Sequence, residues 1–245
     1  MIAASLSGRR VLVTRALEDS SVWAERLAAL GAEPVILPCI RTETLDDAET
    51  RSRLAAALRD ADWLCVMSAR GAEAVALLAG PLPAAIRVAA VGDSTAAAVR
   101  TSLGLTPFVA RGGTSRALGE ELLAEAFSSA SASTRIVVAA AEGGRTDAED
   151  ALERAGALVT RIDVYRTVPA SPTSAPMDLA VEGIGDVLLA SPSAVRGLLN
   201  QASFPSGARI FTIGPTTSAA ATAAGLSVSG EAIHPDFESL VEAMQ

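Results

Sequence analysis

The chain has 245 residues and a net charge of −8, and 50% of its residues are hydrophobic but only 3% are aromatic. That apolar content is enough for one large core or two ordinary ones. The acidic balance and the scarcity of aromatic rings argue against nucleic acid as a partner, and without any lysine an anion-binding side chain must be an arginine.

Short runs rich in Val, Ile and Leu alternate with Ala-rich segments of helical period. Continuous apolar strands that are each followed by a helix indicate parallel sheets covered on both faces. In chain order, the predicted strands are Arg9–Thr14, Pro34–Pro38, Asp62–Met67, Arg87–Val91, Thr106–Val109, Arg135–Ala140, Leu158–Ile162, Asp186–Ala190, Arg209–Ile213 and Leu226–Ser229. The predicted helices between them are 19–30, 47–59, 70–79, 94–103, 114–126, 146–155, 193–201, 216–224 and 236–244.

The chain also contains an internal repeat. Residues 10–42 align without a gap on residues 135–167, and farther on Val91-Gly-Asp-Ser-Thr meets Ile213-Gly-Pro-Thr-Thr. A repeat of about half the chain indicates one duplicated α/β unit rather than a solenoid. We therefore expect two similar lobes, with ligands bound in a cleft between them.

Both copies of the repeat are interrupted at the same place. Polar or Pro/Ser-rich segments, 43–47 and 168–176, follow the Arg-Thr pairs at 41–42 and 166–167. We therefore expect the chain to cross between the lobes twice, near 39–43 and 164–168, and to form a two-stranded hinge there. The first lobe would contain residues 1–40 and 167–245, and the second would be the continuous segment 42–165.

Small and hydroxylated residues follow many of the predicted strands. Ligands of parallel α/β sheets bind beyond the carboxyl ends of the strands, against helix N-termini, so these residues could hold a carboxylate or a phosphate. Each could equally be a helix cap or a turn residue, and capping does not prevent ligand contact. The candidates are Arg15, Ser68, Ser94, Thr95, Gly143, Arg145, Ser191, Ser193, Gly214, Thr216 and Thr217.

Familiar cofactor and metal motifs are missing from the sequence. It has neither the dinucleotide nor the P-loop glycine pattern. His234 is the only histidine and precedes Pro235, so we expect an exposed loop residue and no multi-histidine metal site. Cys39 and Cys65 lie in apolar runs and are expected to be buried thiols. Without an export signal or an apolar run of about 18 residues, we expect a cytoplasmic protein away from membranes.

Tyr165 is the only tyrosine and lies at the second predicted crossing. One interpretation is that its ring packs the joint between the lobes. The other is that its phenol hydrogen-bonds to a leaving or attacking oxygen in the cleft, because tyrosine can act as a general acid.

Motifs along nearly the whole chain together resemble the uroporphyrinogen-III synthase family. The resemblance depends on their order and spacing, because each motif alone has low specificity. The motifs are Val11-Leu-Val-Thr-Arg, Asp62-Trp-Leu-Cys-Val-Met-Ser, Val91-Gly-Asp-Ser-Thr-Ala, Ala141-Glu-Gly-Gly-Arg, Val164-Tyr165, Leu189-Ala-Ser-Pro-Ser-Ala-Val and Ile213-Gly-Pro-Thr-Thr.

This resemblance implies two flavodoxin-like lobes and a specific reaction. Linear hydroxymethylbilane would be cyclised to uroporphyrinogen III, with loss of water and inversion of ring D, without a metal or cofactor. Tyr165 would donate the proton to the departing hydroxyl, and the strand-end candidates would hold the acetate and propionate arms. We further expect a monomer that receives this linear tetrapyrrole transiently from hydroxymethylbilane synthase.

The chain departs from the family pattern at two strand ends. The family's usual Phe-Thr-Ser is Val-Met-Ser at 66–68 and Leu-Ala-Ser at 189–191, so the threonine is absent from both copies and the serines remain. Arg70, close behind the first copy, either adds a carboxylate contact or caps a turn.

Two alternatives share the predicted architecture. The scaffold could be a non-catalytic module that binds a tetrapyrrole or a small anion, because a fold does not dictate a function. A periplasmic-type binding protein would also have two α/β lobes, but it would normally carry an export signal.

Overall fold

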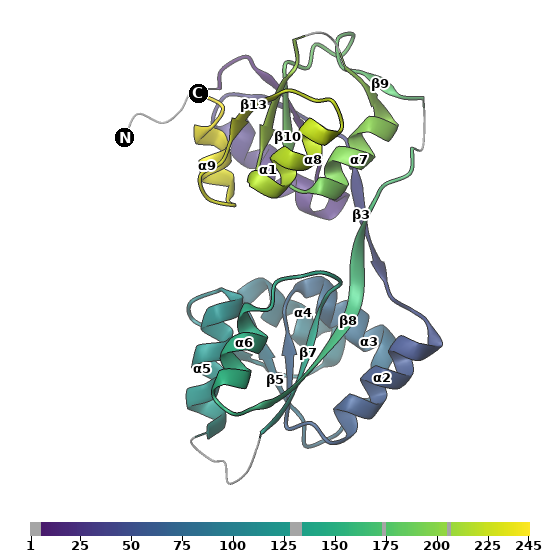
Figure 1. The fold of residues 1–245 in the computed structure, drawn as a ribbon, viewed down its shortest axis with the longest axis vertical. Coiled ribbons are helices and arrows are strands. Elements are labelled where there is room, and N and C mark those ends of the chain that lie inside the picture. The colour runs from purple at the N-terminus through teal and green to yellow at the C-terminus, as the bar shows by residue number, and fades with distance from the viewer. Residues whose placement is uncertain (1–5, 128–133, 173–174, 205–206) are drawn as a thin grey trace. The chain divides into compact units, whose positions relative to one another are not determined.

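The computed structural model describes residues 6–127, 134–172, 175–204 and 207–245 (Figure 1). The chain forms two compact units, one of Met1–Arg41 together with Thr167–Gln245 and the other of Thr42–Arg166. The first unit is therefore built from two separate stretches of chain, and the second is continuous. Both boundaries fall inside the Arg-Thr pairs that the internal repeat superimposes.

The first unit contains a five-stranded sheet of order β13-β12-β10-β1-β2, in which neighbouring strands are parallel. Two short strands, β9 and β11, form a second sheet. The strands are β1 (Arg10–Val13), β2 (Glu33–Ile36), β9 (Met177–Asp178), β10 (Asp186–Leu189), β11 (Ala202–Ser203), β12 (Arg209–Thr212) and β13 (Val228–Glu231). The helices are α1 (Leu17–Ala29), α7 (Pro192–Gln201), α8 (Pro215–Ala223) and α9 (Phe237–Glu242).

Helices cover both faces of this sheet (Figure 1). On one face, Val11 and Val13 of β1 share a core with α1 and α9, where the rings of Trp23 and Phe237 meet edge-on at 5.3 Å. On the other face, Leu12 packs with residues of α7 and α8. Alternate residues of one buried strand thus face opposite helical layers, which explains the continuous apolar runs in the sequence.

The second unit contains a six-stranded sheet of order β3-β8-β7-β4-β5-β6. The pairings from β8 across to β6 are parallel. The strands are β3 (Ile40–Thr44), β4 (Trp63–Val66), β5 (Arg87–Ala90), β6 (Phe108–Val109), β7 (Arg135–Ala141) and β8 (Leu158–Pro169). The helices are α2 (Ala48–Arg59), α3 (Ala69–Ala79), α4 (Asp93–Leu103), α5 (Ser115–Phe127) and α6 (Asp147–Arg154).

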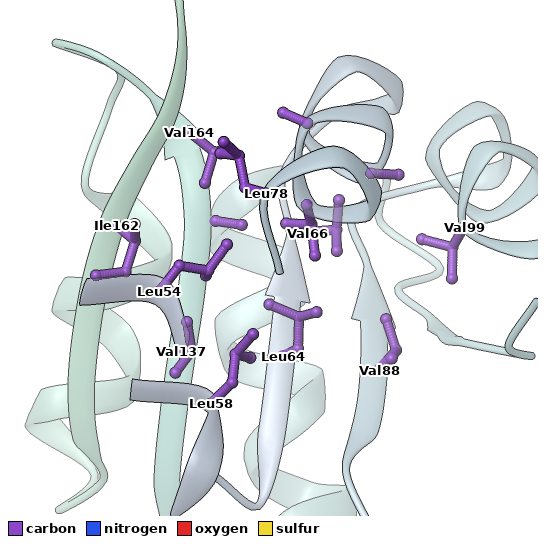
Figure 2. Packing of buried hydrophobic residues seen from close by; sticks show 14 of the residues in the cluster. Leu54, Leu58, Leu64, Val66, Leu78, Val88, Val99, Val137, Ile162 and Val164 are labelled. Atoms are coloured by element: carbon purple, nitrogen blue, oxygen red, sulfur yellow. The ribbon is translucent and has the colours of Figure 1, made fainter. Parts of the chain in front are cut away.

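This sheet also has a core on each face. Figure 2 shows the core beneath α2, α3 and α4, where Leu54 and Leu58 of α2 lie over the strands that carry Val137 and Ile162. Trp63 and the other inward residues of the opposite face pack with α5 and α6. The predicted class, α/β with parallel sheets covered by helices, is confirmed.

Two strands differ from the sequence prediction. Among the strands predicted from apolar runs, β8 ends at Ile162 and β3 is absent, although a two-stranded hinge was expected near 39–43 and 164–168. In the structure β8 continues to Pro169, and β3 covers Ile40–Thr44. Polar residues such as Asp163 and Arg166 interrupt the apolar run, so its pattern does not predict a strand. β3 and β8 are neighbours in the sheet, and the Leu45 N–H donates to the Val164 carbonyl at 2.9 Å. Both strands run across the unit boundaries.

A buried ion pair at the amino end of the first unit's sheet ties three parts of the chain together. Asp186 is 1% exposed and accepts hydrogen bonds from Arg9 Nε at 2.6 Å and Arg209 Nε at 2.8 Å. Arg9 Nη1 also donates to the carbonyl of Met244, at 2.8 Å. The carboxylate at the start of β10 thus links Arg9, just before β1, to Arg209 at the start of β12, and Arg9 in turn bonds the chain just beyond α9.

We expect Asp186→Asn to lower the free energy of unfolding of the first unit by about 2 kcal/mol, because two arginines lose their buried anion. Urea denaturation measures this, with Trp23 as the reporter in a Trp63→Phe background. Glu33→Gln is the control, since Glu33 is exposed and pairs with Arg10 at 3.7 Å. Equal losses in the two variants would mean that burial adds nothing to this pair.

Candidate active site

The carboxyl edge of the second unit's sheet carries one group of the predicted site residues. The strands β4, β5, β7 and β8 are parallel, so their carboxyl ends meet at this edge. Ser68 follows β4 and caps α3, and Tyr165 lies in β8, where it pairs with Ala141 of β7. Two residues that are 97 positions apart in sequence thus come into contact at 2.9 Å.

The contact between Ser68 and Tyr165 belongs to a directed chain of hydrogen bonds. The Gly71 N–H donates to Ser68 Oγ at 3.0 Å, and Ser68 Oγ donates to Tyr165 Oη at 2.9 Å. The Tyr165 oxygen is therefore the acceptor in this contact, which leaves the phenol proton available to a further partner. The serine also orders the helix, since an N-cap hydroxyl satisfies an amide at the helix start.

The rest of Tyr165 is held by its surroundings. Its ring is partly buried and packs against the core that underlies α2 and α3. Its carbonyl accepts from the Glu142 N–H at 2.8 Å, at the point where β7 ends. Ring and backbone are thus both anchored, which fixes the direction of the phenol.

Arg161 forms a network at the same edge that the sequence did not predict. Its guanidinium donates to Asp163 at 2.8 Å, to the Ala141 carbonyl at 2.6 Å and to Glu149. Burial acts to lower the pKa of Arg161, but the bonds to Asp163 and Glu149 outweigh it and the pKa is raised. The partners lie up to 20 residues away, so no local motif could have indicated the network.

The network lines a cavity of about 560 Å³ in the second unit. Charged residues of both signs surround this cavity, and they come from β8, from the end of β7 and from the first turns of α2. They include Arg53, Glu142, Arg161, Asp163 and Arg166. None of these five was among the site residues predicted from the sequence.

Other candidates of this unit lie at the same edge without a shared contact. Ser94 is exposed in the first turn of α4, whereas Thr95 is 2% exposed. Gly143 has a φ of 66°, a conformation that favours glycine. The side chain of Arg145 is 78% exposed and pairs with Asp147 at 2.8 Å.

In the first unit, the remaining candidates lie at the carboxyl ends of β1, β10 and β12. Ser191 caps α7 through the Ala194 N–H at 3.1 Å, as Ser68 caps α3 in the other unit. Ser193 is partly buried in the first turn of α7. Gly214 precedes α8, whose first turn holds Thr216, which is exposed, and Thr217, which is 2% exposed.

Arg15 is held firmly by neighbours in the first unit. Its guanidinium lies 4.6 Å from the centre of the Trp23 ring and bonds Asp19 at 3.2 Å. Its Nε is buried and has no hydrogen-bond partner within the described part of the chain. The side chain as a whole is 31% exposed, so part of the guanidinium is accessible to an anion.

The described residues include other side chains that can be reactive or can bind metals, namely those of the cysteines and of His234. Burial raises the pKa of the Cys39 thiol to about 12 and also raises that of Cys65, so both are unreactive buried thiols. His234 is exposed. Over the described ranges, His, Cys, Asp and Glu form no group of three that could hold a metal. None of the helices described is long and apolar enough to span a bilayer.

The model of the family described as uroporphyrinogen-III synthase HemD matches residues 21–242. The chain belongs to this family. The uroporphyrinogen-III synthase of Synechococcus elongatus is 29% identical over 236 residues, which cover 87% of this chain and 85% of that protein. Members of this family are lyases, so the chain is an enzyme. The resemblance inferred from the sequence motifs is confirmed.

Solved structures of uroporphyrinogen-III synthases share the fold. A mutant form from Thermus thermophilus has a TM-score of 0.51 and 20% identity, and the match covers 97% of this chain and 96% of that one. The protein from Helicobacter pylori has a TM-score of 0.53 and 14% identity, over 96% and 97%. The non-catalytic module considered as an alternative is not favoured by these comparisons.

Proposed function

We propose that this chain cyclises hydroxymethylbilane to uroporphyrinogen III, with loss of water and inversion of ring D. Membership of the uroporphyrinogen-III synthase family supports the reaction. The observation that carries the mechanism is the hydrogen bond from Ser68 to Tyr165, because it directs the phenol of a family-matched tyrosine.

Tyr165 is the proposed general acid. As the bond between the bilane's terminal carbon and its hydroxyl breaks, the phenol gives its proton to the departing oxygen and water leaves. The Ser68 hydroxyl then stabilises the phenolate that forms, since its donated bond strengthens as negative charge develops on Tyr165. The azafulvenium cation that remains is attacked by the substituted carbon of ring D, and the spiro intermediate rearranges and closes, releasing a proton that restores the phenol.

The substrate's carboxylate arms are proposed to bind at the carboxyl edges of the two sheets. Backbone N–H groups and hydroxyls at helix N-termini suit carboxylates. The partly exposed guanidinium of Arg15 adds a charged donor. The proposed binding residues are Arg15, Ser68, Ser94, Thr95, Gly143, Arg145, Ser191, Ser193, Gly214, Thr216 and Thr217.

Since binding is spread over many contacts, we expect Ser191→Ala to raise KM only a few-fold, about two- to fivefold, with little change in kcat. Steady-state kinetics measures this. Asp236→Ala is the control, because Asp236 caps α9 through Ser239 at 2.8 Å and is not a proposed binding residue. A total loss of activity in correctly folded Ser191→Ala enzyme would contradict distributed binding.

We also propose that the two units arose by duplication with exchange of their first strands. The sheet orders support this, because β13-β12-β10-β1-β2 matches β6-β5-β4-β7-β8 strand for strand. The registers agree as well: Arg10 pairs with Glu33 in one unit, and Arg135 pairs with Leu158 in the other. The paired strands β3 and β8 are the proposed hinge.

A coupled assay tests the proposed reaction. Porphobilinogen and a deaminase generate the bilane, and chromatography separates the oxidised products as isomer I or isomer III. Mainly isomer III is expected. Isomer I alone, from folded protein, would overturn the proposed function. Transfer of the bilane from hydroxymethylbilane synthase, and a monomer in the cytoplasm, stay predictions.

A further inference from the structure

Arg161 joins the two ends of the loop at residues 141–145. Its Nη2 donates to the Ala141 carbonyl at 2.6 Å, and its Nη1 donates to the Arg145 carbonyl at 3.3 Å. The loop contains Gly143 and Arg145, both proposed to bind a carboxylate arm. One planar guanidinium that bonds both ends of a loop removes much of the loop's conformational freedom.

Gly144 allows this close approach. A Cβ at this position would lie 3.0 Å from the Ala141 carbonyl oxygen and 3.3 Å from Arg161 Nη2. Both distances are tighter than ordinary van der Waals contact. The loop backbone therefore sits directly against the guanidinium, and a larger residue would push the two apart.

The charge of Arg161 is already matched by protein carboxylates. Glu149 is 5% exposed and accepts from Nη1, and Asp163 accepts from Nε at 2.8 Å. With its donors directed at these groups and at two carbonyls, Arg161 is not a free anion receptor. Its contacts hold the loop rather than a ligand.

The first unit shows that the fold does not require this network. Val138 pairs with Arg161 in the second unit, and Val13 pairs with Ile36 at the same place of the first unit's sheet. The internal repeat likewise superimposes Ala24 on Glu149 and Pro38 on Asp163. The same strand–helix–strand arrangement thus forms with no ion at this position, so a structural requirement does not explain the network.

We propose that Arg161 is a positioning residue for substrate binding, which orders residues 141–145 so that this loop can hold a carboxylate arm beside Tyr165. The inference rests on the proposed function. Ala141 pairs with Tyr165 and the Glu142 N–H bonds its carbonyl, so the loop ordered by Arg161 begins at the catalytic strand.

The kinetic test uses Arg161→Lys, which keeps the charge but cannot reach both carbonyls and both carboxylates at once. We expect KM for the bilane to rise about tenfold, with kcat within about threefold of wild type. A purely structural defect would reduce the amount of active enzyme and leave KM unchanged. The matched control is Arg154→Lys, because Arg154 is exposed and bonds the carbonyl of Asp150 on its own helix, α6.

Hydrogen–deuterium exchange tests the same inference without turnover. In Arg161→Lys, amides of residues 142–147 should exchange about tenfold faster, and peptides of the first unit should be unchanged. Gly144→Ala should also raise KM about tenfold, although Arg161 keeps its charge. This variant replaces Arg161→Lys as the test if the lysine variant fails to fold. If KM and exchange both remain at wild-type values, the inference is wrong. If the wild-type enzyme produced no isomer III, the proposed function would be refuted. The ordering of the loop by Arg161 would still be tested, because hydrogen–deuterium exchange does not depend on turnover.

Discussion

Tyr165→Phe is expected to lower kcat by about 10- to 100-fold and to leave the fold intact. The phenylalanine ring keeps the packing against the core, so only the proton donor is lost. Because protonation assists departure of the hydroxyl without forming a covalent intermediate, some turnover should remain. Single-turnover kinetics with freshly generated bilane measures the rate, and the proportion of isomer I should rise as the enzyme slows.

Ser68→Ala provides the matched comparison. It removes the donor to Tyr165 and the cap of α3, so we expect a smaller loss in kcat, about three- to tenfold, and about 1 kcal/mol of stability. In the double variant, the loss should scarcely exceed that of Tyr165→Phe, because the serine acts on kcat through the phenol. Unchanged turnover in Tyr165→Phe would remove the phenol from the mechanism.

Gly197→Ala is expected to destabilise the first unit by about 3 kcal/mol or more, or to prevent it from folding. A Cβ on Gly197 would lie 1.7 Å from the carbonyl oxygen of Cys39. Neither group can turn away, since Gly197 lies inside α7 and the Cys39 carbonyl also accepts from the Ala170 N–H at 2.8 Å. The helix would have to move off the sheet, and Ser191 at its start would move with it.

Gly185→Ala is the control for this substitution. Gly185 belongs to the same unit, and nothing lies within 4 Å of its Cβ position, so its stability should change by less than about 0.5 kcal/mol. Urea denaturation followed by Trp23 in a Trp63→Phe background reports the first unit in both variants. A small loss in Gly197→Ala would show that α7 can shift at little cost.

The spacing of apolar residues along the sequence predicted most of the helices and strands, because most of them are buried on one or two faces. Every helix expected from the sequence has a counterpart in the structure, and the runs around Val11 and Leu64 are buried strands. The short strands β9 and β11 were not predicted, because two residues are too few to show an alternating pattern of apolar side chains. The apolar pattern did not predict the polar stretch of β8 beyond Ile162, because that segment is stabilised by strand pairing rather than by an apolar face. Only the crossing expected from the repeat, near 164–168, indicated a strand there.

The candidate site was predictable only where the chemistry lies at strand ends. The rule for parallel sheets led to Ser68, and the predicted crossing together with the family resemblance led to Tyr165. Neither indicated that the two hydroxyls bond each other. Arg161 escaped because its role depends on carbonyls and carboxylates brought together by folding. A lone arginine in a strand has no sequence signature of its own.

The discontinuous first unit has a consequence for synthesis on the ribosome. β1 lies between β2 and β10, so Val11 pairs with Pro34 on one side and with Asp186 on the other. The second partner is made only after the whole of Thr42–Arg166 has been translated, a delay on the order of 6 to 25 s at about 5 to 20 residues per second. During that time the continuous unit can fold, while the apolar β1–α1–β2 segment waits without its central neighbour. The nascent chain is thus most exposed to misassembly and to chaperone capture in its β1–α1–β2 segment.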